Sequence, residues 1–263
     1  MTDPTCQSSG ATVQVMTFNA WCDHPAHPDW EKRRAACASV FRETTADVVA
    51  GQEFTSRMLD DLSRDLEQYR WIGAGRDDGD RAGEFTPVFY RPDRLELSRH
   101  GTFWLAPDPS TVGLGWNARC HRTTTWAEFR DHETGRPFLF ASTHFDHRGG
   151  LARTQSARLL RTHLPALSNG IPSILAGDFN CRPSSRPYRV LSEAWQDARH
   201  ATRTPPRGPA RTWRGWSRLG LGAARIDHVF VSPRIPVLEY RVWDTPAVRL
   251  ASDHRPVTAR LRL

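Results

Sequence analysis

Apolar, strand-like runs in this chain repeatedly stop on a residue that carries an acid, an amide or an imidazole. Runs of this kind end at Asn19, Glu53, Asp178, Asp227 and His254. Polar side chains that close the strands of one sheet tend to meet at its edge, so the pattern predicts one polar site built from distant parts of the chain. Oxygen ligands and histidine, without a cysteine cluster, suit a hard cation such as Mg²⁺ or Mn²⁺. Such cations serve phosphoester hydrolysis.

The hydrophobic periodicity predicts an α/β protein. Helices are expected over residues 29–45, 55–67 and 151–167, and strands over 13–18, 86–91, 136–145, 171–176, 225–231 and 256–263. Segments 73–83, 107–115 and 200–224 are rich in glycine, proline or charge and are predicted to be loops. Because the polar motifs span both ends of the chain, we expect a single domain over residues 13–263, preceded by a flexible segment over residues 1–12.

Composition narrows the class of protein. The 36 Lys and Arg against 29 Asp and Glu give a net charge of +7, which favours anionic partners. Lys32 is the sole lysine and arginine occurs along the whole chain, so basicity alone does not indicate nucleic acid. Five widely spaced cysteines argue against a disulfide framework or structural zinc site. No apolar run approaches a membrane span, and the first residues do not resemble a signal peptide, so we expect a cytoplasmic monomer.

Three short motifs follow one another along the chain, and their order is more specific than any one of them alone. They are Gly-Asp-Phe-Asn at 177–180, Ile-Asp-His at 226–228 and Ser-Asp-His at 252–254. Together they resemble the endonuclease/exonuclease/phosphatase (DNase I-like) superfamily, and the resemblance runs from about residue 13 to residue 263. Segments 75–79, 103–105 and 146–147 resemble a bacterial branch whose substrates are mostly unassigned. The resemblance implies a four-layer α/β sandwich, in which two packed mixed β-sheets are flanked by helices. It also implies a metal-dependent phosphoesterase.

The resemblance assigns roles to most of the motif residues. Asp178 would align the nucleophilic water and Asn180 would support the transition state. Asp227 and His254 would form a dyad, in which His254 acts on the water or binds a phosphate oxygen. The metal would be held, directly or through water, by Glu53, Asn19 and Asp253.

A second histidine belongs to the same resemblance. His144 matches a residue that contacts the scissile phosphate, and Glu84 opens a segment like that of secreted DNases, in which a glutamate orients this histidine. The alternative for Glu84 is an ordinary loop residue. Arg122 precedes a strand, as a phosphate-contacting arginine does in the DNase branch.

The remaining candidates concern the substrate. Asp146 and His147 either shape specificity or brace their loop. The loop over residues 200–224 interleaves cations with aromatic faces, which suits a phosphorylated ligand or a nucleic-acid strand. From it we expect Arg211, Trp213, Arg214 and Trp216 to contact substrate.

Three functions compete. The first is hydrolysis of a small phosphorylated metabolite or head group, the second is cleavage of DNA or RNA, and the third is phosphate-ligand binding on a non-catalytic scaffold. The third is disfavoured because no expected catalytic position is substituted. A nuclease needs a long basic face, whereas the arginines here are diffuse outside residues 200–224, so the sequence favours the small phosphoester.

Overall fold

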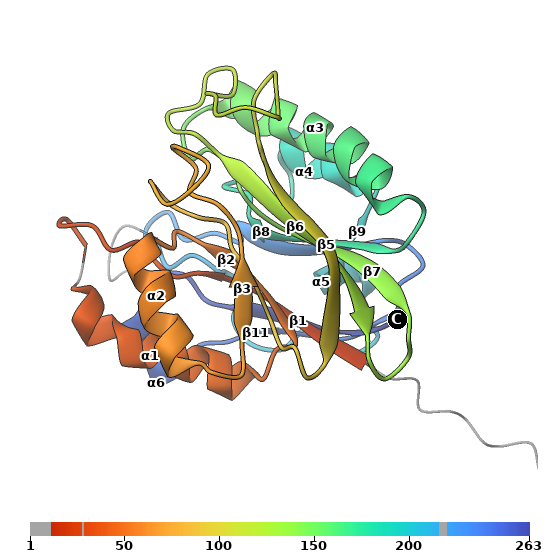
Figure 1. The fold of residues 1–263 in the computed structure, drawn as a ribbon, viewed down its shortest axis with the longest axis horizontal. Helices are drawn as coiled ribbons and strands as arrows, with labels where there is room; N and C mark the ends of the chain where they lie inside the picture. The colour runs from red at the N-terminus through yellow and green to blue at the C-terminus, as the bar shows by residue number, and fades with distance from the viewer. Residues whose placement is uncertain (1–11, 28, 216–219) are drawn as a thin grey trace, which may run out of the picture.

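The computed structural model describes residues 12–27, 29–215 and 220–263. The expected flexible segment lies outside the described residues, except for Thr12, which begins the first strand; Trp216 also lies outside them. Two six-stranded sheets pack face to face, and helices cover the outer face of each (Figure 1). The predicted four-layer sandwich is therefore confirmed.

The first sheet has the strand order β11-β12-β1-β2-β4-β3. These strands are β1 (Thr12–Asn19), β2 (Val48–Gln52), β3 (Arg70–Ile72), β4 (Val88–Tyr90), β11 (Val237–Val242) and β12 (Val257–Arg262). Strands β1 and β2 run parallel, and the other neighbours run antiparallel. Helices α1 (Trp30–Thr44), α2 (Ser56–Asp65) and α6 (Pro246–Ala251) cover its outer face (Figure 1). Successive side chains of β1 point to opposite faces of the sheet, and both faces are buried. Val13 and Val15 face the second sheet, while Met16 and Phe18 face the helices.

The second sheet has the order β5-β6-β7-β8-β10-β9. These strands are β5 (Leu95–Trp104), β6 (Thr123–Asp131), β7 (Pro137–His144), β8 (Ser173–Asp178), β9 (Gln196–Asp197) and β10 (Asp227–Val231). Helices α3 (Gly150–Ser168) and α4 (Arg186–Ser192) cover this sheet, and the one-turn α5 (Ala198–Ala201) follows β9 (Figure 1). Phe138 and Phe140 fill the space between the sheets, whereas Leu139 and Ala141 pack in the cluster beneath α3 and α4.

Local sequence sets the helix boundaries. The side chain of Asp29 caps α1 by accepting from the backbone N–H of Glu31, and Thr55 caps α2 by accepting from that of Met58. Helix α1 ends at Thr45 in the left-handed conformation. Within the described parts of the chain, no helix is both long and apolar enough to cross a lipid bilayer.

Candidate active site

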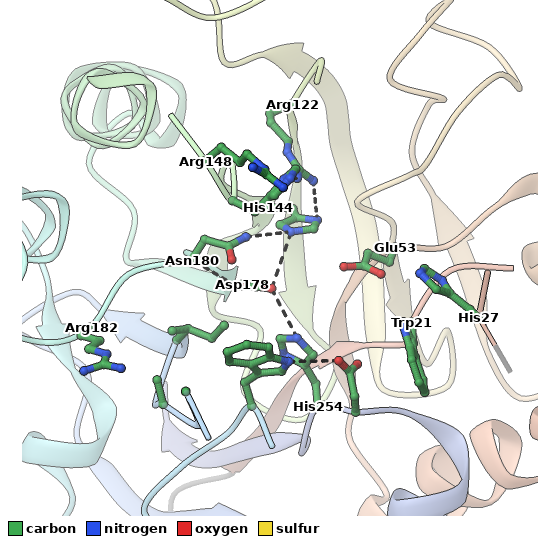
Figure 2. Close-up of a pocket in the computed structure, with 16 residues that line it drawn as sticks. Trp21, His27, Glu53, Arg122, His144, Arg148, Asp178, Asn180, Arg182 and His254 are labelled. Atoms are coloured by element: carbon green, nitrogen blue, oxygen red, sulfur yellow. Dashed lines mark hydrogen bonds and ion pairs between the residues drawn. The ribbon is translucent and has the colours of Figure 1, made fainter. Parts of the chain in front are cut away.

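Strand register brings the polar strand ends together. Asn19 pairs with Gln52 across the parallel strands β1 and β2, which places Glu53 beside it. Asp178 pairs with His144 on β7 and with Asp227 on β10. These residues lie at one edge of the two sheets. Side chains from both sheets line a cavity of about 870 Å³ (Figure 2), which is within the range of roughly 300–1,000 Å³ for small-molecule sites.

Three of the six non-glycine residues with positive φ in the described parts of the chain line this cavity. Trp21, Glu53 and Asn180 line it with φ angles of 58°, 60° and 46°, and each follows the end of a strand by one or two residues. L-amino acids rarely adopt such angles, at a cost of order 1–3 kcal/mol each. The chain thus turns sharply at the ends of β1, β2 and β8, and the side chains of these residues face the cavity.

Asp178 occupies the centre of the site. Its Oδ1 accepts a hydrogen bond of 2.8 Å from the backbone N–H of Asn180. Its Oδ2 lies 3.2 Å from Asn19 Nδ2, 3.6 Å from His144 Nε2 and 3.8 Å from His254 Nε2. Burial raises the pKa of Asp178 to about 7, and the negative charge of Asp227 adds to this effect.

His254 is held by a carboxylate. Its Nδ1 lies 3.1 and 3.0 Å from the two carboxylate oxygens of Asp227. Burial opposes a charge on this imidazole, but Asp227 outweighs burial and raises the pKa of His254 well above its usual value. The Nδ1–H therefore donates to Asp227, and the Nε2–H is directed toward Asp178.

His144 is held by a cation instead. Its Nδ1 lies 2.8 Å from Nη1 of Arg122, and because a guanidinium only donates hydrogen bonds, Nδ1 accepts and Nε2 carries the proton. Burial lowers the pKa of His144 well below its usual value, and Arg122 lowers it further. The Nε2 atom lies 3.1 Å from Nδ2 of Asn180, another donor. Nδ2 of Asn180 also donates to the backbone oxygen of Phe145 at 2.9 Å. Because two donors cannot bond to each other, His144 and Asn180 are both available to donate to an anionic oxygen.

The expected contact between Glu84 and His144 requires correction. Oε2 of Glu84 accepts a hydrogen bond of 2.7 Å from Arg76 and lies 3.8 Å from Nη1 of Arg122. Arg122 therefore stands between Glu84 and the imidazole. The physical reason is that the buried guanidinium of Arg122 needs a nearby negative charge. Glu84 can act on His144 only through Arg122.

Carboxylate and amide oxygens on the other side of Asp178 suit a hard cation. Glu53 accepts hydrogen bonds of 2.9 Å from Asn19 Nδ2 and 3.2 Å from the backbone N–H of Cys22. Oδ2 of Asp253 accepts from Nε1 of Trp213 at 3.0 Å, whereas its Oδ1 is buried and accepts no hydrogen bond from the described residues. A buried acceptor without a donor fits a divalent cation. Potential ligand atoms of Glu53, His144 and Asp178 also lie within 4.8 Å of one another.

The loop over residues 200–224 ends near the site, but the expectation that it also begins there is wrong. Thr202 bridges Val237, at the end of β11 that pairs with Leu261, whereas Trp213 bridges Ala224 and His254. Trp213 lines the cavity. Arg214 is corrected: its guanidinium donates to the backbone oxygens of Arg249 and Ser252, because the end of helix α6 presents free carbonyl groups there. Arg211 is also corrected, since it is exposed and does not line the cavity.

Asp146 and His147 were expected either to shape specificity or to brace their loop, and the structure places them differently. The carboxylate of Asp146 is buried and braces its surroundings by accepting from four backbone N–H groups, those of Arg119, Cys120, Arg148 and Gly149. His147 lines the cavity, and its Nδ1 lies 3.2 Å from Nη2 of Arg122.

Four cavity residues lie outside the motifs and loops that the sequence analysis singled out, namely Trp21, His27, Arg148 and Arg182. Three of them follow a recognised residue closely: Trp21 is two residues beyond Asn19, Arg148 is one beyond His147 and Arg182 is two beyond Asn180. Extending each motif by two residues would have found these three. His27 carries no such signal.

A buried arginine joins two of the loops that carry site residues. Arg33, on α1, is 1% exposed and donates to the backbone oxygens of Ala20 and Trp21 at 2.7 and 2.6 Å, and to that of Ala251 at 2.8 Å. The first two oxygens follow Asn19, and the third precedes Asp253. The side chain therefore fixes the end of β1 relative to the end of α6.

Comparisons with known proteins identify the fold and the family of this chain. The sequence profile described as "Endonuclease/Exonuclease/phosphatase family" matches residues 16–254. The crystal structure of an endonuclease/exonuclease/phosphatase from Bacteroides vulgatus is 35% identical, covers 96% of this chain and 99% of its own, and superposes with a TM-score of 0.91. A mannosyl-6-phosphatase from Bacteroides thetaiotaomicron is 29% identical, covers 95% of this chain and 100% of its own, and has a TM-score of 0.85.

One curated relative matches more distantly. Nocturnin from Drosophila melanogaster is 22% identical over 173 residues, which are 62% of this chain. The match spans 26% of the Nocturnin, about a quarter of its length.

Proposed function

The chain belongs to the endonuclease/exonuclease/phosphatase family, and we propose that it hydrolyses the phosphoester of a small phosphorylated molecule with the help of Mg²⁺ or Mn²⁺. One observation carries the proposal. Oδ2 of Asp178 lies within 4 Å of the Nε2 atoms of both His144 and His254, in a cavity that also presents the carboxylates of Glu53 and Asp253. A base, two imidazole donors and a set of oxygen ligands are the groups that attack of water on phosphorus requires.

The cation would be held by Glu53 and Asp253, with Asn19 orienting Glu53. When bound, it supplies positive charge to neutralise the negative charge that develops on the phosphoryl oxygens. The oxygen-rich ligand set supports Mg²⁺ or Mn²⁺ over softer metals.

The chain's own residues would perform the remaining steps. Asp178 accepts the proton of the water whose oxygen bonds to phosphorus, and the P–O bond to the leaving group breaks. The leaving oxygen keeps the bonding electrons and takes up a proton from solvent water to become the alcohol. The Nε2–H of His144 and the amide of Asn180 donate to one phosphoryl oxygen, while His254 donates to another. Positioning and electrostatic stabilisation would supply most of the rate acceleration.

Three observations support a small substrate over a nucleic-acid strand. The cavity has the volume of a small-molecule site. A relative that is 29% identical is a mannosyl-6-phosphatase. Many arginines outside the cavity are paired with acids, among them Arg34 with Asp65 and Arg99 with Glu128, which reduces any continuous basic face. Activity as a monomer and a cytoplasmic location are also part of the proposal.

The test is a chelation and substrate series. We expect EDTA to abolish hydrolysis and Mg²⁺ or Mn²⁺ to restore it, and we expect sugar monophosphates to be hydrolysed with a higher kcat/KM than a single-stranded oligonucleotide. The Asp178→Asn variant, purified identically, controls for contaminating phosphatase. KM should rise only shallowly with salt, since few phosphates are bound at once. Full activity after exhaustive chelation would exclude the metal-dependent mechanism, and a steep salt dependence would favour a nuclease.

A further inference from the structure

The two members of the Asp227–His254 pair belong to different sheets. Asp227 opens β10 in the second sheet, whereas His254 precedes β12 in the first. The two sheets pack against each other through apolar side chains. Strand pairing within each sheet therefore does not set the distance between this carboxylate and this imidazole, and another contact has to do so.

Thr212, in the loop over residues 200–224, binds the backbone on both sides of this pair. Its Oγ1 accepts hydrogen bonds from the N–H groups of Ile226 and Asp227, each at 3.1 Å. Its carbonyl oxygen accepts from the N–H of Arg255, the residue after His254, at 2.7 Å. Thr212 is 0% exposed, so solvent does not compete for these bonds. One residue thus ties the start of β10 to the segment that leads into β12.

The residues that follow Thr212 extend this connection. Trp213 forms β-bridges with Ala224 on one side and with His254 on the other, and its indole N–H donates to Asp253 at 3.0 Å. The N–H of Arg214 donates to the carbonyl oxygen of Asp253 at 3.1 Å. The segment is therefore hydrogen-bonded on both sides, and a shift of one neighbour relative to the other would break some of these bonds.

The Asp227–His254 pair depends on an accurate separation. Nδ1 of His254 lies 3.1 and 3.0 Å from the two oxygens of Asp227, and its Nε2 lies 3.8 Å from Oδ2 of Asp178 (Figure 2). Hydrogen bonds weaken beyond about 3.2 Å between heavy atoms. Misplacement of a reacting group by about 1 Å can lower a rate about 10²-fold. A shift of the Asp227 backbone would turn the imidazole away from the phosphate that it is proposed to contact.

Neither substrate binding nor packing accounts for the hydroxyl of Thr212. The side chain is buried and does not line the cavity. Valine has nearly the same shape and would fill the same space without the cost of burying a polar atom. The hydroxyl is explained by the two N–H groups that it accepts from, one of which belongs to Asp227.

We propose that Thr212 is a positioning residue for hydrolysis, which holds Asp227 and His254 at the separation that directs the imidazole toward the phosphate. The inference rests on the proposed function. It assigns this part of the loop to the chemical step rather than to the choice of substrate. Loss of the hydroxyl should therefore lower kcat and leave KM nearly unchanged.

Three substitutions separate the hydroxyl from the packing of the side chain. Thr212→Val leaves two buried N–H groups without an acceptor, and kcat should fall about 10²-fold. Thr212→Ala makes room for a water molecule to accept from them, so it is the variant to measure if Thr212→Val does not fold; kcat should still fall about tenfold. Thr212→Ser keeps the hydroxyl and should retain a kcat close to that of the wild-type protein. The substrate is the sugar monophosphate that the wild-type protein hydrolyses fastest.

Thr44→Val is the matched control. Thr44 is 1% exposed, and its hydroxyl binds the backbone oxygens of Val40 and Phe41 at the end of α1. Its loss should lower the midpoint of urea denaturation without changing kcat or KM. Circular dichroism and urea denaturation of every variant then distinguish a lower stability from a misplaced imidazole.

NMR gives a readout that does not depend on turnover. The Nδ1 proton of His254 is hydrogen-bonded to Asp227 and should give a resonance at low field, which His254→Gln would assign by its loss. Thr212→Val and Thr212→Ala should move this resonance upfield or broaden it by exchange with solvent. Thr212→Ser and Thr44→Val should leave it in place.

Two results would overturn the positioning role. One is an unchanged kcat in a folded Thr212→Val or Thr212→Ala variant. The other is a loss of kcat in Thr212→Ser as large as that in Thr212→Ala, because the methyl group and not the hydroxyl would then be responsible. Both leave the proposed function intact, since the wild-type protein still hydrolyses its substrate. Conversely, a wild-type protein without any phosphoesterase activity would refute the proposed function, while the Nδ1 resonance would still test the position of the imidazole.

Discussion

The two histidines beside Asp178 have the same side chain and the same burial, yet their partners set them in opposite states. Nδ1 of His254 lies against the carboxylate of Asp227, which raises the pKa of this imidazole against the effect of burial. Nδ1 of His144 lies against the guanidinium of Arg122, which lowers the pKa in the same direction as burial.

The difference shows how one residue type can serve two tasks in one cavity. A charged His254 donates from Nε2 and carries positive charge to the phosphate. A neutral His144 also donates from Nε2, because Arg122 fixes its tautomer, but it adds no charge of its own. The chemistry of each half of the site is thus decided by a residue behind the imidazole that need not touch the substrate.

The largest effect should come from the residue that both halves share. Asp178→Asn keeps the size of the side chain and removes the proton acceptor, so kcat should fall about 10³-fold, in the range of general-base contributions. The fold should survive, because asparagine has the size of aspartate and packs in the same space. The substitution removes only a buried negative charge close to Asp227. Steady-state kinetics with a circular dichroism control measures this, and a near-normal kcat would mean that the site lies elsewhere.

A smaller effect should separate the two residues behind His144. Arg122→Gln removes the group that fixes the tautomer and should reduce kcat/KM about 10²-fold, comparable to the loss of one preorganised donor. Glu84→Gln should cost only a few-fold, because Glu84 reaches the imidazole through Arg122. A double-mutant cycle would show the dependence: the effect of Glu84→Gln should vanish once Arg122 is replaced. Fully additive losses would place Glu84 outside this chain of contacts.

A third buried histidine, His228, lies outside the cavity and can be compared with His144 and His254. His228 donates from Nε2 to the carbonyl of Cys181, while Asp197 accepts from Arg225 beside it. Burial opposes the charge of Asp197, but His228 and Arg225 outweigh it and hold the pKa of this carboxyl below its usual value.

Asp197→Asn should therefore change stability and not kcat. Loss of one member of a buried ion pair should lower the free energy of unfolding by about 3 kcal/mol at pH 7. Since the native pKa is depressed, the wild-type advantage should be complete above the unfolded pKa of about 4 and shrink as the pH falls below it. Urea denaturation at several pH values measures this difference. A difference that grows toward low pH would contradict the assignment.

The sequence predicted the centre of the site better than its surroundings, for a physical reason. Asn19, Asp178 and Asp227 close or open strands, and strand register then forces them together at one edge. The pairing of Arg122 with His144 depends instead on how β6 and β7 pack against the segment around Glu84. Such pairing has no local signal.

In the fold, too, the elements with a regular local pattern were predicted and the irregular ones were missed. The long, periodic helices α1 and α3 were predicted to within a few residues, since an apolar stripe marks them. Strand β5 was missed because a register shift between Leu97 and Arg99 and a glycine at 101 interrupt its alternation. The direction of Arg214 was missed because the attracting carbonyls belong to helix α6, which is 35 residues further along the chain.

The most direct test of the account is the protonation of the two imidazoles, read by NMR from the ring ¹⁵N shifts of histidine-labelled, metal-free protein at pH 7. His144→Gln and His254→Gln variants would assign the signals. The account predicts protons on both ring nitrogens of His254 and on Nε2 alone of His144, and predicts that Asp227→Asn converts His254 to a neutral ring without changing His144. If both rings had the same protonation state in the wild-type protein, the comparison on which this account of the site depends would be wrong.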